Sequence, residues 1–527
     1  MALDGVSPKP LHTESEKAYP SKSPASERAA IADRAPSRQI SRESIRPDQS
    51  AVAQDQRLTR RYVPNTSAVL SLLDLFCVGT AQTAIFAAVH DRLSLFGPTH
   101  VPLVAGISVL ANMVFLYAAG CYRRDTLVSP AMATSRLPVA LGFGGFALFA
   151  ALHYGLAELF PHTAVYQSVS QCAMIALIGA GTSLCAASVS RVLFYAMVRR
   201  RWFRRRILVL GTGRRAVYLH ELMGQAAHRL ENNLIFAPES IIGGTVQDAL
   251  RDAVIPVQTK SIDVLARELT VDEVVIAVDE RRGISLERLL ACKTNGIPVT
   301  DYNTFIERET GRVDLNWLEL SWLVYSNGFQ MRLIDTMLKR LLDISTSFIL
   351  LLVSFPVLVG AMIAIALEGH GNVLFKQKRV TQDGRGFWLY KLRTMRPDAE
   401  VQGPQWADVD DPRITSVGAF LRRTRIDEIP QLINVLRGDM SLVGPRPERP
   451  VFVEQLSQDI RMYNLRHSVK SGLTGWAQIN YPYGASNADA ERKLEYDLYY
   501  IKNYSLLRDI SIILQTLRVL LWPQGVR

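Results

Sequence analysis

Long stretches without a charged side chain limit the folds open to this sequence more than any other feature. Asp74 is the only charged residue between Arg61 and Asp91, and three further uncharged stretches follow before Arg191. Each stretch can hold a helix of about 20 residues, the length that crosses a bilayer. Four such stretches in succession argue against the alternative, which is a soluble bundle of buried helices. We therefore predict a four-helix transmembrane unit over residues 61–200.

The basic residues around these stretches are distributed unequally, and this sets the orientation. Arginines precede the first stretch and follow the second and the fourth, whereas the opposite ends carry Arg92 and little else. The positive-inside rule then places both ends of the unit in the cytoplasm. Residues 1–60 are rich in Ser, Pro, Ala, Arg and Glu, which predicts a disordered cytoplasmic tail rather than a signal peptide.

From Ile207 the pattern becomes that of an α/β domain. Short buried-strand runs occur at 207–210, 273–278 and 297–300, separated by segments that suit helices. Alternating strands and helices favour a parallel sheet. We predict a Rossmann-like cytoplasmic middle domain over residues 207–325.

A glycine-rich loop follows the first of these strands. Gly211, Gly213 and Ala216 match a dinucleotide-binding fingerprint. The acid expected to bind a ribose hydroxyl would have to be Glu231, which does not lie at a convincing strand end. We therefore predict a structural or regulatory module without bound NAD.

A fifth uncharged stretch extends over residues 344–367 and is interrupted by Pro356. A proline removes a backbone hydrogen bond and kinks a helix, and Ser354 can satisfy a freed carbonyl. The stretch on its own suits a kinked span or a helix that enters the membrane and returns. A span would put everything after it outside the cell, because no later apolar run is long enough to return.

The overall composition narrows the choice of function only a little. Lys and Arg outnumber Asp and Glu by 60 to 49, a net charge of +11, which suits a membrane surface, a nucleic acid or an acidic phosphate. The five cysteines form no CxxC pair, which argues against a disulfide framework or a zinc site.

The densest group of chemically active residues lies at 420–432, where Asp427 and Glu428 follow three arginines. Neighbours on a helix diverge by about 100°, so one carboxylate can meet a phosphorus atom while the other binds a metal. Phosphoryl transfer needs this division between a nucleophile and a cation. Taken alone, the pattern also suits an ordinary helix start, with Thr424 and Asp427 as a capping box.

Four other motifs surround this one in the sequence. They comprise Leu374-Phe375-Lys376-Gln377-Lys378-Arg379-Val380, Tyr390-Lys391-Leu392-Arg393-Thr394-Met395, Gly438-Asp439-Met440-Ser441-Leu442-Val443-Gly444-Pro445-Arg446-Pro447-Glu448 and Val469-Lys470-Ser471-Gly472-Leu473-Thr474-Gly475-Trp476-Ala477-Gln478-Ile479-Asn480. The run Lys339-Arg340-Leu341-Leu342-Asp343 precedes all five motifs. Basic residues recur in loops punctuated by Gly and Pro, as an anion site requires.

These five motifs, in this order, resemble those of the bacterial polyisoprenyl-phosphate hexose-1-phosphate transferases, the monotopic phosphoglycosyl transferases. The resemblance extends from Lys339 to about Leu521, and the four spans with the middle domain resemble the long form typified by undecaprenyl-phosphate glucose phosphotransferases. It implies a catalytic domain over 332–527 with a re-entrant membrane helix at about 341–368. This chain departs from many relatives at Ser471-Gly472, where they read Pro-Gly, and from some at the spacing of Ser354 and Pro356.

The resemblance also implies roles for individual residues. The catalytic dyad falls on Asp427 and Glu428, with Glu428 helping to bind Mg²⁺. The expected substrate-binding residues are Lys391, Arg393, Arg422, Arg446 and, less closely matched, Asp497. The helix break falls on Ser354 and Pro356.

The resulting hypothesis is a transferase of the bacterial inner membrane, with its catalytic domain facing the cytoplasm. Asp427 attacks a UDP-hexose, UMP leaves, and undecaprenyl phosphate takes up the hexose phosphate to begin a surface glycan such as an exopolysaccharide. Glucose is the expected hexose and galactose the alternative. The expected partners are these two substrates and membrane lipid, a homodimer is a candidate assembly, and nucleic acid is not expected.

Two other classes of function stay open. A membrane-bound NAD-dependent nucleotide-sugar enzyme would use the loop at Gly211, although no Tyr-x-x-x-Lys pair of the usual short-chain kind occurs. A non-catalytic membrane scaffold would explain the spans and the basic loops but not the five ordered motifs.

Overall fold

A computed structural model provides the coordinates of the protein. It describes residues 65–93, 101–155, 168–225, 231–238, 250, 254, 261–280, 284–318, 328–329, 332–369, 371–399, 411–482, 484 and 486–521. The tail predicted over residues 1–60 lies outside the described residues.

Five helices in the described part of the chain are long and apolar enough to cross a membrane. They comprise α2 (Thr66–Leu93), α3 (Val101–Ala118), α6 (Leu137–Ala150, with the short α5, Pro130–Ser135, before it), α8 (Val169–Arg199) and α15 (Leu333–Leu367). The first four pack on one another around buried side chains that include Leu70, Leu116, Leu141 and Phe194. The apolar stretches of the sequence are therefore confirmed as candidate membrane helices.

The one charge inside the first apolar stretch is paired within this bundle. Both carboxylate oxygens of Asp74 accept hydrogen bonds from Arg191 of α8 at 2.8 Å, and both side chains are almost completely buried. An ionisable group within a membrane helix is stable only when it faces such a partner. Asp74 thereby ties α2 to α8.

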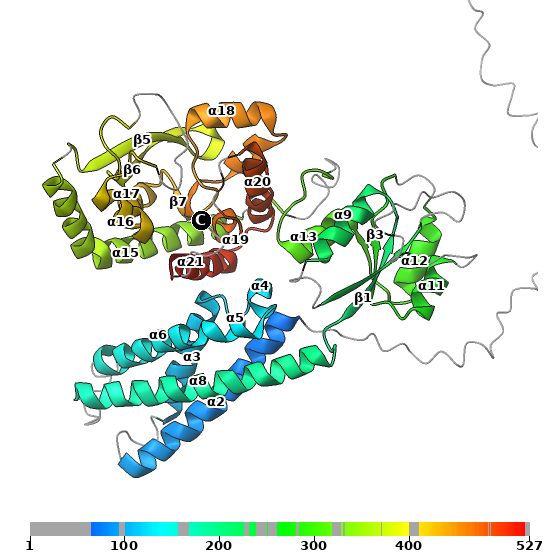
Figure 1. Ribbon diagram of the computed structural model, residues 1–527, viewed down its shortest axis with the longest axis horizontal. Helices are drawn as coiled ribbons and strands as arrows, with labels where there is room; N and C mark the ends of the chain where they lie inside the picture. The colour runs from blue at the N-terminus through cyan, green and yellow to red at the C-terminus, as the bar shows by residue number, and fades with distance from the viewer. Residues whose placement is uncertain are drawn as a thin grey trace, which may run out of the picture. The chain divides into compact units, whose positions relative to one another are not determined.

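A parallel sheet of four strands follows α8. Its strands are β1 (Arg205–Leu210), β2 (Asn232–Ala237), β3 (Glu273–Ile276) and β4 (Val299–Asp301), in the spatial order β2-β1-β3-β4. The sequence patterns do not predict β2, which pairs with β1 and also bridges to Val254 through Phe236. Apolar side chains alternate between the faces, so α9 (Arg214–Met223) and α13 (Tyr302–Thr310) cover one face while α11 (Ile262–Glu268) and α12 (Leu286–Thr294) cover the other (Figure 1).

The part of the chain after α15 combines short helices with two small sheets. Its elements are β5 (Leu374–Val380), β6 (Gly386–Leu392), α16 (Ser416–Thr424), the 3₁₀ turn η6 (Ile426–Glu428), α17 (Gln431–Arg437), β7 (Ser441–Val443), α18 (Pro450–Asp459), η7 (Tyr463–Ser468), β8 (Gly472–Thr474), α19 (Trp476–Asn480), α20 (Asn487–Lys502) and α21 (Leu506–Leu521). β5 and β6 form an antiparallel hairpin, and β7 pairs with β8 in parallel. We call this part, together with α15, the C-terminal domain.

Polar contacts hold the first third of α15 to the C-terminal domain. Lys339 donates to Asp509 at 2.6 Å, and Arg340 donates to the carbonyls of Val435 and Leu436 at 2.6 and 2.7 Å. Asp343 accepts from the main-chain N–H of Leu442 at 3.0 Å. The Lys-Arg-Leu-Leu-Asp motif is thus the attachment of this helix to the domain behind it.

The later part of α15 returns to the same domain. Leu358, Ala361 and Ile365 pack against Leu392 of β6 and Leu421 of α16. Only 11% of the apolar window of α15 is buried, against 28–39% in the other four candidate spans. Figure 1 shows that the helix changes direction along its length. Both ends of α15 therefore contact one domain, while its middle leaves large apolar side chains exposed.

The segment after the middle sheet packs on the C-terminal domain. Val313 and Leu318 lie in one apolar cluster with Leu456, Tyr463 and Leu498. Residues that the sequence assigns to the middle domain thus contribute to the core of the next one.

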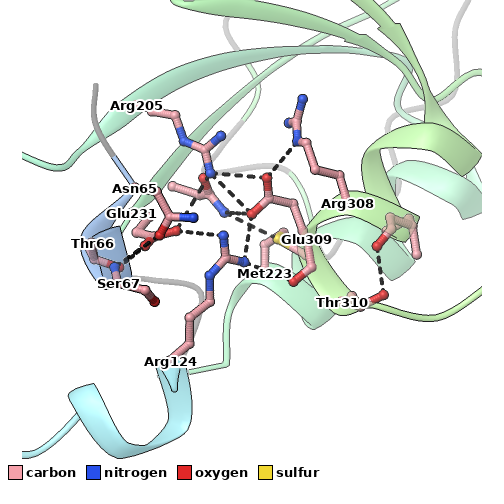
Figure 2. A network of polar contacts seen from close by, with 12 residues as sticks. Asn65, Thr66, Ser67, Arg124, Arg205, Met223, Glu231, Arg308, Glu309 and Thr310 are labelled. Atoms are coloured by element: carbon pink, nitrogen blue, oxygen red, sulfur yellow. Dashed lines mark hydrogen bonds and ion pairs between the residues drawn. The ribbon is translucent and has the colours of Figure 1, made fainter. Parts of the chain in front are cut away.

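A network of ion pairs joins the segment after α3 to the middle sheet (Figure 2). Arg124, the first residue of the short helix α4 (Arg124–Leu127), contacts Glu231 at 2.9 Å and Glu309 at 3.0 Å. Arg205 and Arg308 also contact Glu309, at 3.1 and 3.0 Å. Burial alone would raise the pKa of Glu309, but the three arginines outweigh it and lower that pKa to about 2.

Replacing Glu309 with Gln tests this junction. The side chain of Glu309 is fully buried, and removing one partner from a buried ion pair destabilises a protein by about 3–5 kcal/mol. We expect Glu309→Gln to lower the melting temperature of the full-length protein in detergent. Because the folded pKa lies below the ordinary 4.5, this stabilisation is present at neutral pH and is lost as the pH falls toward about 2.

Glu221→Gln is the control, because Glu221 is exposed on α9. Equal melting temperatures for the two variants at pH 7 would show that the junction contributes nothing to stability.

Candidate active site

The two adjacent carboxylates lie where one helix ends and the next begins. α16 ends at Thr424, whose hydroxyl donates to the carbonyls of Phe420 and Leu421 at 2.9 and 3.2 Å. Arg425 then adopts the left-handed conformation with φ of 59°, and η6 carries Asp427 and Glu428. The capping-box interpretation of this segment is wrong, because Thr424 closes a helix instead of starting one.

Three cations from three different elements converge on one oxygen of Glu428. Lys391 of β6 lies 3.3 Å from Oε1, Arg425 lies 3.4 Å from it, and Arg446, in the loop after β7, lies 3.1 Å from it. Burial alone would raise the pKa of Glu428, but Lys391, Arg446 and Arg425 hold that pKa well below its usual range. Glu428 is therefore ionised at any physiological pH.

Asp427 is in a different environment from its neighbour. Its side chain is 5% exposed, and its Oδ1 atom has no hydrogen-bond partner among the described residues. Burial raises the pKa of Asp427, although Lys391 opposes the shift. A carboxylate oxygen that is shielded from water and unpaired is prepared to meet an electrophile or a cation.

The remaining predicted site residues are placed at different distances from this dyad. Arg422 is half-buried on the last turn of α16. Burial raises the pKa of Asp427, and the positive charge of Arg422 opposes part of that shift. Arg393 instead donates to the carbonyl of Ile365 at 3.3 Å, so it supports the end of α15. Asp497 of α20 is buried and pairs with Arg466 at 2.9 Å.

Two arginines gain importance only in the folded structure. Arg425 belongs to the arginine-rich motif, but no local pattern shows that its left-handed backbone brings its guanidinium to Glu428. Arg466 lies far from the dyad in sequence and donates to the carbonyl of Arg446 at 3.1 Å. Long-range contacts of this kind leave no periodic signal in a single sequence.

Ser354 and Pro356 occupy the middle of α15. The hydroxyl of Ser354 donates to the carbonyl of Leu350 at 2.6 Å. Pro356 has no N–H to donate to the carbonyl of Leu352, four residues before it. Ser354 bonds the carbonyl of Leu350 and not the carbonyl of Leu352 that the proline leaves free. Such back-bonding of a serine often bends a helix, as proline does.

The dyad suits a magnesium ion held jointly with a substrate. The described residues contain no group of three His, Cys, Asp or Glu side chains that could hold a metal on their own. Magnesium commonly uses one or two carboxylates together with substrate phosphates. The unpartnered Oδ1 of Asp427 and the carboxylate of Glu428 provide donors of that type.

The glycine-rich loop of the middle domain already holds an anion of its own. The carboxylate of Asp279 accepts from the main-chain N–H groups of Arg214 and Arg215 at 2.8 and 3.0 Å. These are the first N–H groups of α9, where a dinucleotide would place its diphosphate. Glu231, the candidate ribose ligand, is bound to Arg124 instead. This geometry disfavours a dinucleotide at the loop.

Comparison with known proteins assigns the C-terminal domain to a family. The model of the bacterial sugar transferase family matches residues 334–523. A UDP-N-acetylgalactosamine-undecaprenyl-phosphate N-acetylgalactosaminephosphotransferase of Aeromonas hydrophila is 41% identical over 46% of this chain and 56% of its own length. The UDP-glucose:undecaprenyl-phosphate glucose-1-phosphate transferase of Escherichia coli is 43% identical over 35% of this chain and 40% of its own.

A shorter relative is matched almost throughout. The exopolysaccharide production protein PSS of Rhizobium leguminosarum is 41% identical over 34% of this chain and 94% of its own length. The chain spans about half the length of the first two relatives.

The three cations around Glu428 differ in exposure, and their removal should therefore have unequal effects. The side chain of Lys391 is 21% exposed and that of Arg425 is 47% exposed, so water screens Arg425 more strongly. We expect Lys391→Met to raise the pKa of Glu428 more than Arg425→Met does. Isotope-edited infrared titration of the Glu428 carboxylate measures both shifts, and equal shifts would contradict this ranking.

Proposed function

Because this chain belongs to the bacterial sugar transferase family, we propose that it transfers a hexose-1-phosphate from a UDP-sugar to undecaprenyl phosphate at the cytoplasmic face of a bacterial inner membrane. The observation that carries the proposal is the difference in environment between Asp427 and Glu428. A buried carboxylate with an unpaired oxygen lies beside a second one that three cations hold ionised. Nucleophilic phosphoryl transfer needs that combination of a reactive oxygen and concentrated positive charge.

The first step uses Asp427 as the nucleophile. One carboxylate oxygen forms a bond to the sugar-bearing phosphorus as the bond from that phosphorus to the UMP oxygen breaks, and UMP leaves. Lys391 and Arg446 neutralise the charge that builds up on the phosphate oxygens. A magnesium ion, when bound, would offset the charge of the diphosphate.

The second step regenerates the carboxylate. An oxygen of undecaprenyl phosphate bonds to the same phosphorus, and the bond between that phosphorus and Asp427 breaks. The products are a lipid diphosphate sugar, which begins a surface glycan, and free enzyme. The acceptor is a lipid, so the reacting phosphorus has to lie near the bilayer surface.

The form of α15 supports a re-entrant helix that meets this requirement. Asp343, near one end, and Ile365, near the other, both contact the C-terminal domain. A helix that crossed the bilayer would place these residues on opposite sides of it. A helix that enters and returns at Pro356 keeps both on the cytoplasmic side and leaves its exposed apolar middle in lipid.

The donor sugar is proposed to be glucose, after the name of the relative from E. coli, with galactose as an alternative. N-acetylgalactosamine is a further candidate, because the relative from A. hydrophila named for it is matched over a longer stretch of this chain. The middle domain is proposed to be a Rossmann-like module with a structural or regulatory role, since its own Asp279 occupies the loop a dinucleotide would use.

Asp427→Asn and Glu428→Gln should impair the reaction in different ways. Without lipid acceptor, the wild-type protein should release about one UMP per site from its preferred UDP-sugar and retain labelled phosphosugar on Asp427, with ping-pong kinetics when acceptor is present. Asp427→Asn should abolish this release. Glu428→Gln should slow it and weaken its magnesium dependence, because a neutral amide is a poor ligand for a hard cation.

Glu454→Gln, on the exposed face of α18, is the control and should leave the kinetics unchanged. A panel of labelled UDP-sugars identifies the donor. Intersecting initial-rate lines without a protein adduct would mean that the lipid phosphate attacks directly, and no lipid-linked label from any UDP-sugar would refute the proposed function.

Cysteine labelling tests the topology of α15. Gly369, just after the helix, has a φ of 77° that a side chain strains, so the exposed Asn372 is the better position. In intact cells with a permeabilised outer membrane, Asn372→Cys should be protected from an impermeant thiol reagent. Pro356→Leu should straighten the helix, so a protein that carries both Asn372→Cys and Pro356→Leu should be labelled more strongly than one that carries Asn372→Cys alone. Full labelling of Asn372→Cys alone would show that α15 spans the membrane.

A further inference from the structure

The loop that carries Arg446 is held by an unbroken series of carbonyl contacts. The carbonyl of Pro445 accepts from the N–H of Gly472 at 2.8 Å, that of Pro447 from Arg379 at 3.2 Å, and that of Glu448 from Val380 at 3.0 Å. Prolines fix the φ angle and offer no N–H of their own. The loop is therefore secured through its carbonyl groups.

The carbonyl of Arg446 itself is held by a side chain. Arg466 of η7 donates from NH2 to this carbonyl at 3.1 Å and to Asp497 of α20 at 2.9 Å, and from NH1 to the hydroxyl of Tyr463 at 2.5 Å. The side chain of Arg466 is 7% exposed and that of Asp497 is 2% exposed. A planar guanidinium can bond several acceptors in fixed directions, and burial strengthens each bond.

We propose that Arg466 is a positioning residue of the transfer reaction: held by Asp497, it fixes the main chain of Arg446 and thereby directs the Arg446 guanidinium at Glu428 and the donor diphosphate. This inference rests on the function proposed above. Arg466 does not touch the dyad. Its effect passes through the 3.1 Å contact between Arg446 and Glu428.

A cation that binds phosphate is most effective when its geometry is fixed before the substrate arrives. The side chain of Arg446 is 35% exposed, so packing alone does not hold it. The contact with Arg466 restrains the main chain from which this side chain extends. It also gives a proposed role to Asp497, which bonds Arg466 and does not contact the dyad.

The chain contains a matched control for this role. Arg312 is also a buried arginine that donates to a tyrosine hydroxyl, that of Tyr218 at 2.9 Å, and to a carboxylate of α20, that of Glu495 at 2.8 Å. Its side chain is 6% exposed, like that of Arg466. The two arginines differ in that Arg466 also holds the carbonyl of Arg446.

The experiment compares Arg466→Lys with Arg312→Lys in the full-length protein. Lysine keeps the charge in both cases but cannot bond three acceptors as a planar fork does. We expect similar melting temperatures for the two variants. We expect Arg466→Lys to lower kcat/KM for the UDP-sugar about tenfold, the equivalent of one charge-assisted hydrogen bond, while kcat/KM for the lipid acceptor changes little. Arg312→Lys should leave both parameters close to those of the wild type.

Calorimetric binding of UDP separates this inference from the proposed function. Arg466→Lys should weaken UDP binding about tenfold and Arg312→Lys should not. Asp497→Asn, which keeps the shape, should weaken it in the same direction and serves if Arg466→Lys does not fold. Equal effects of Arg466→Lys and Arg312→Lys would overturn the positioning role even if the wild type is an active transferase. If UDP binding differs between the variants as expected but the wild type transfers no sugar, the proposed function is refuted and the positioning role stands. If the wild type does not bind UDP, both the proposed function and the positioning role are overturned.

Discussion

The ion cluster on Glu428 is the interaction around which the C-terminal domain is organised. A carboxylate that is only 13% exposed needs opposite charge close by, and here the charge comes from a strand, a left-handed turn and a proline-flanked loop. The main chain that carries two of these cations is itself bonded by a side chain: Tyr390 of β6 donates its N–H to Asn434 of α17, and Arg466 donates to the carbonyl of Arg446. Asp427 shares the turn but has no hydrogen-bond partner on Oδ1, so a carboxylate paired with three cations lies beside one with an unpaired oxygen.

The same turn is joined to the membrane helix. Ile426 and Ile429, on either side of the dyad, pack on the apolar cluster formed by Ala361 and Ile365 of α15 with Leu421. The site of chemistry therefore lies directly on the helix that is proposed to dip into lipid. In the proposed reaction the donor is soluble and the acceptor is a lipid phosphate. This contact would set the distance between their binding sites, because a packed apolar interface allows little relative movement.

The sequence predicted local features of the fold better than it predicted long-range contacts. Uncharged stretches and adjacent carboxylates are local patterns, so the membrane helices and the position of the dyad could be predicted from them. Arg393 was expected at the substrate, yet β6 ends at Leu392, and the Arg393 side chain bonds the carbonyl of Ile365 whereas Lys391 bonds Glu428. Strand β2 was missed because Phe236 and Ala237 are its only fully buried apolar residues, and the role proposed for Arg466 depends on a loop twenty residues away. Tertiary pairing, and not local preference, decided each of these cases.

Buried ion pairs connect the parts of the chain, and two of them fix the position of α20 relative to its neighbours. A buried pair adds little net stability compared with apolar packing, but it strongly disfavours any arrangement that leaves one partner alone. Glu495 and Asp497 are two residues apart on α20, about 200° around the helix, so they face different neighbours. Glu495 binds Arg312, which follows the middle sheet, whereas Asp497 binds Arg466 behind the dyad. Both carboxylates are therefore paired in only one register of α20. In that register α20 holds both the segment after the middle sheet, through Arg312, and the loop that carries Arg446, through Arg466.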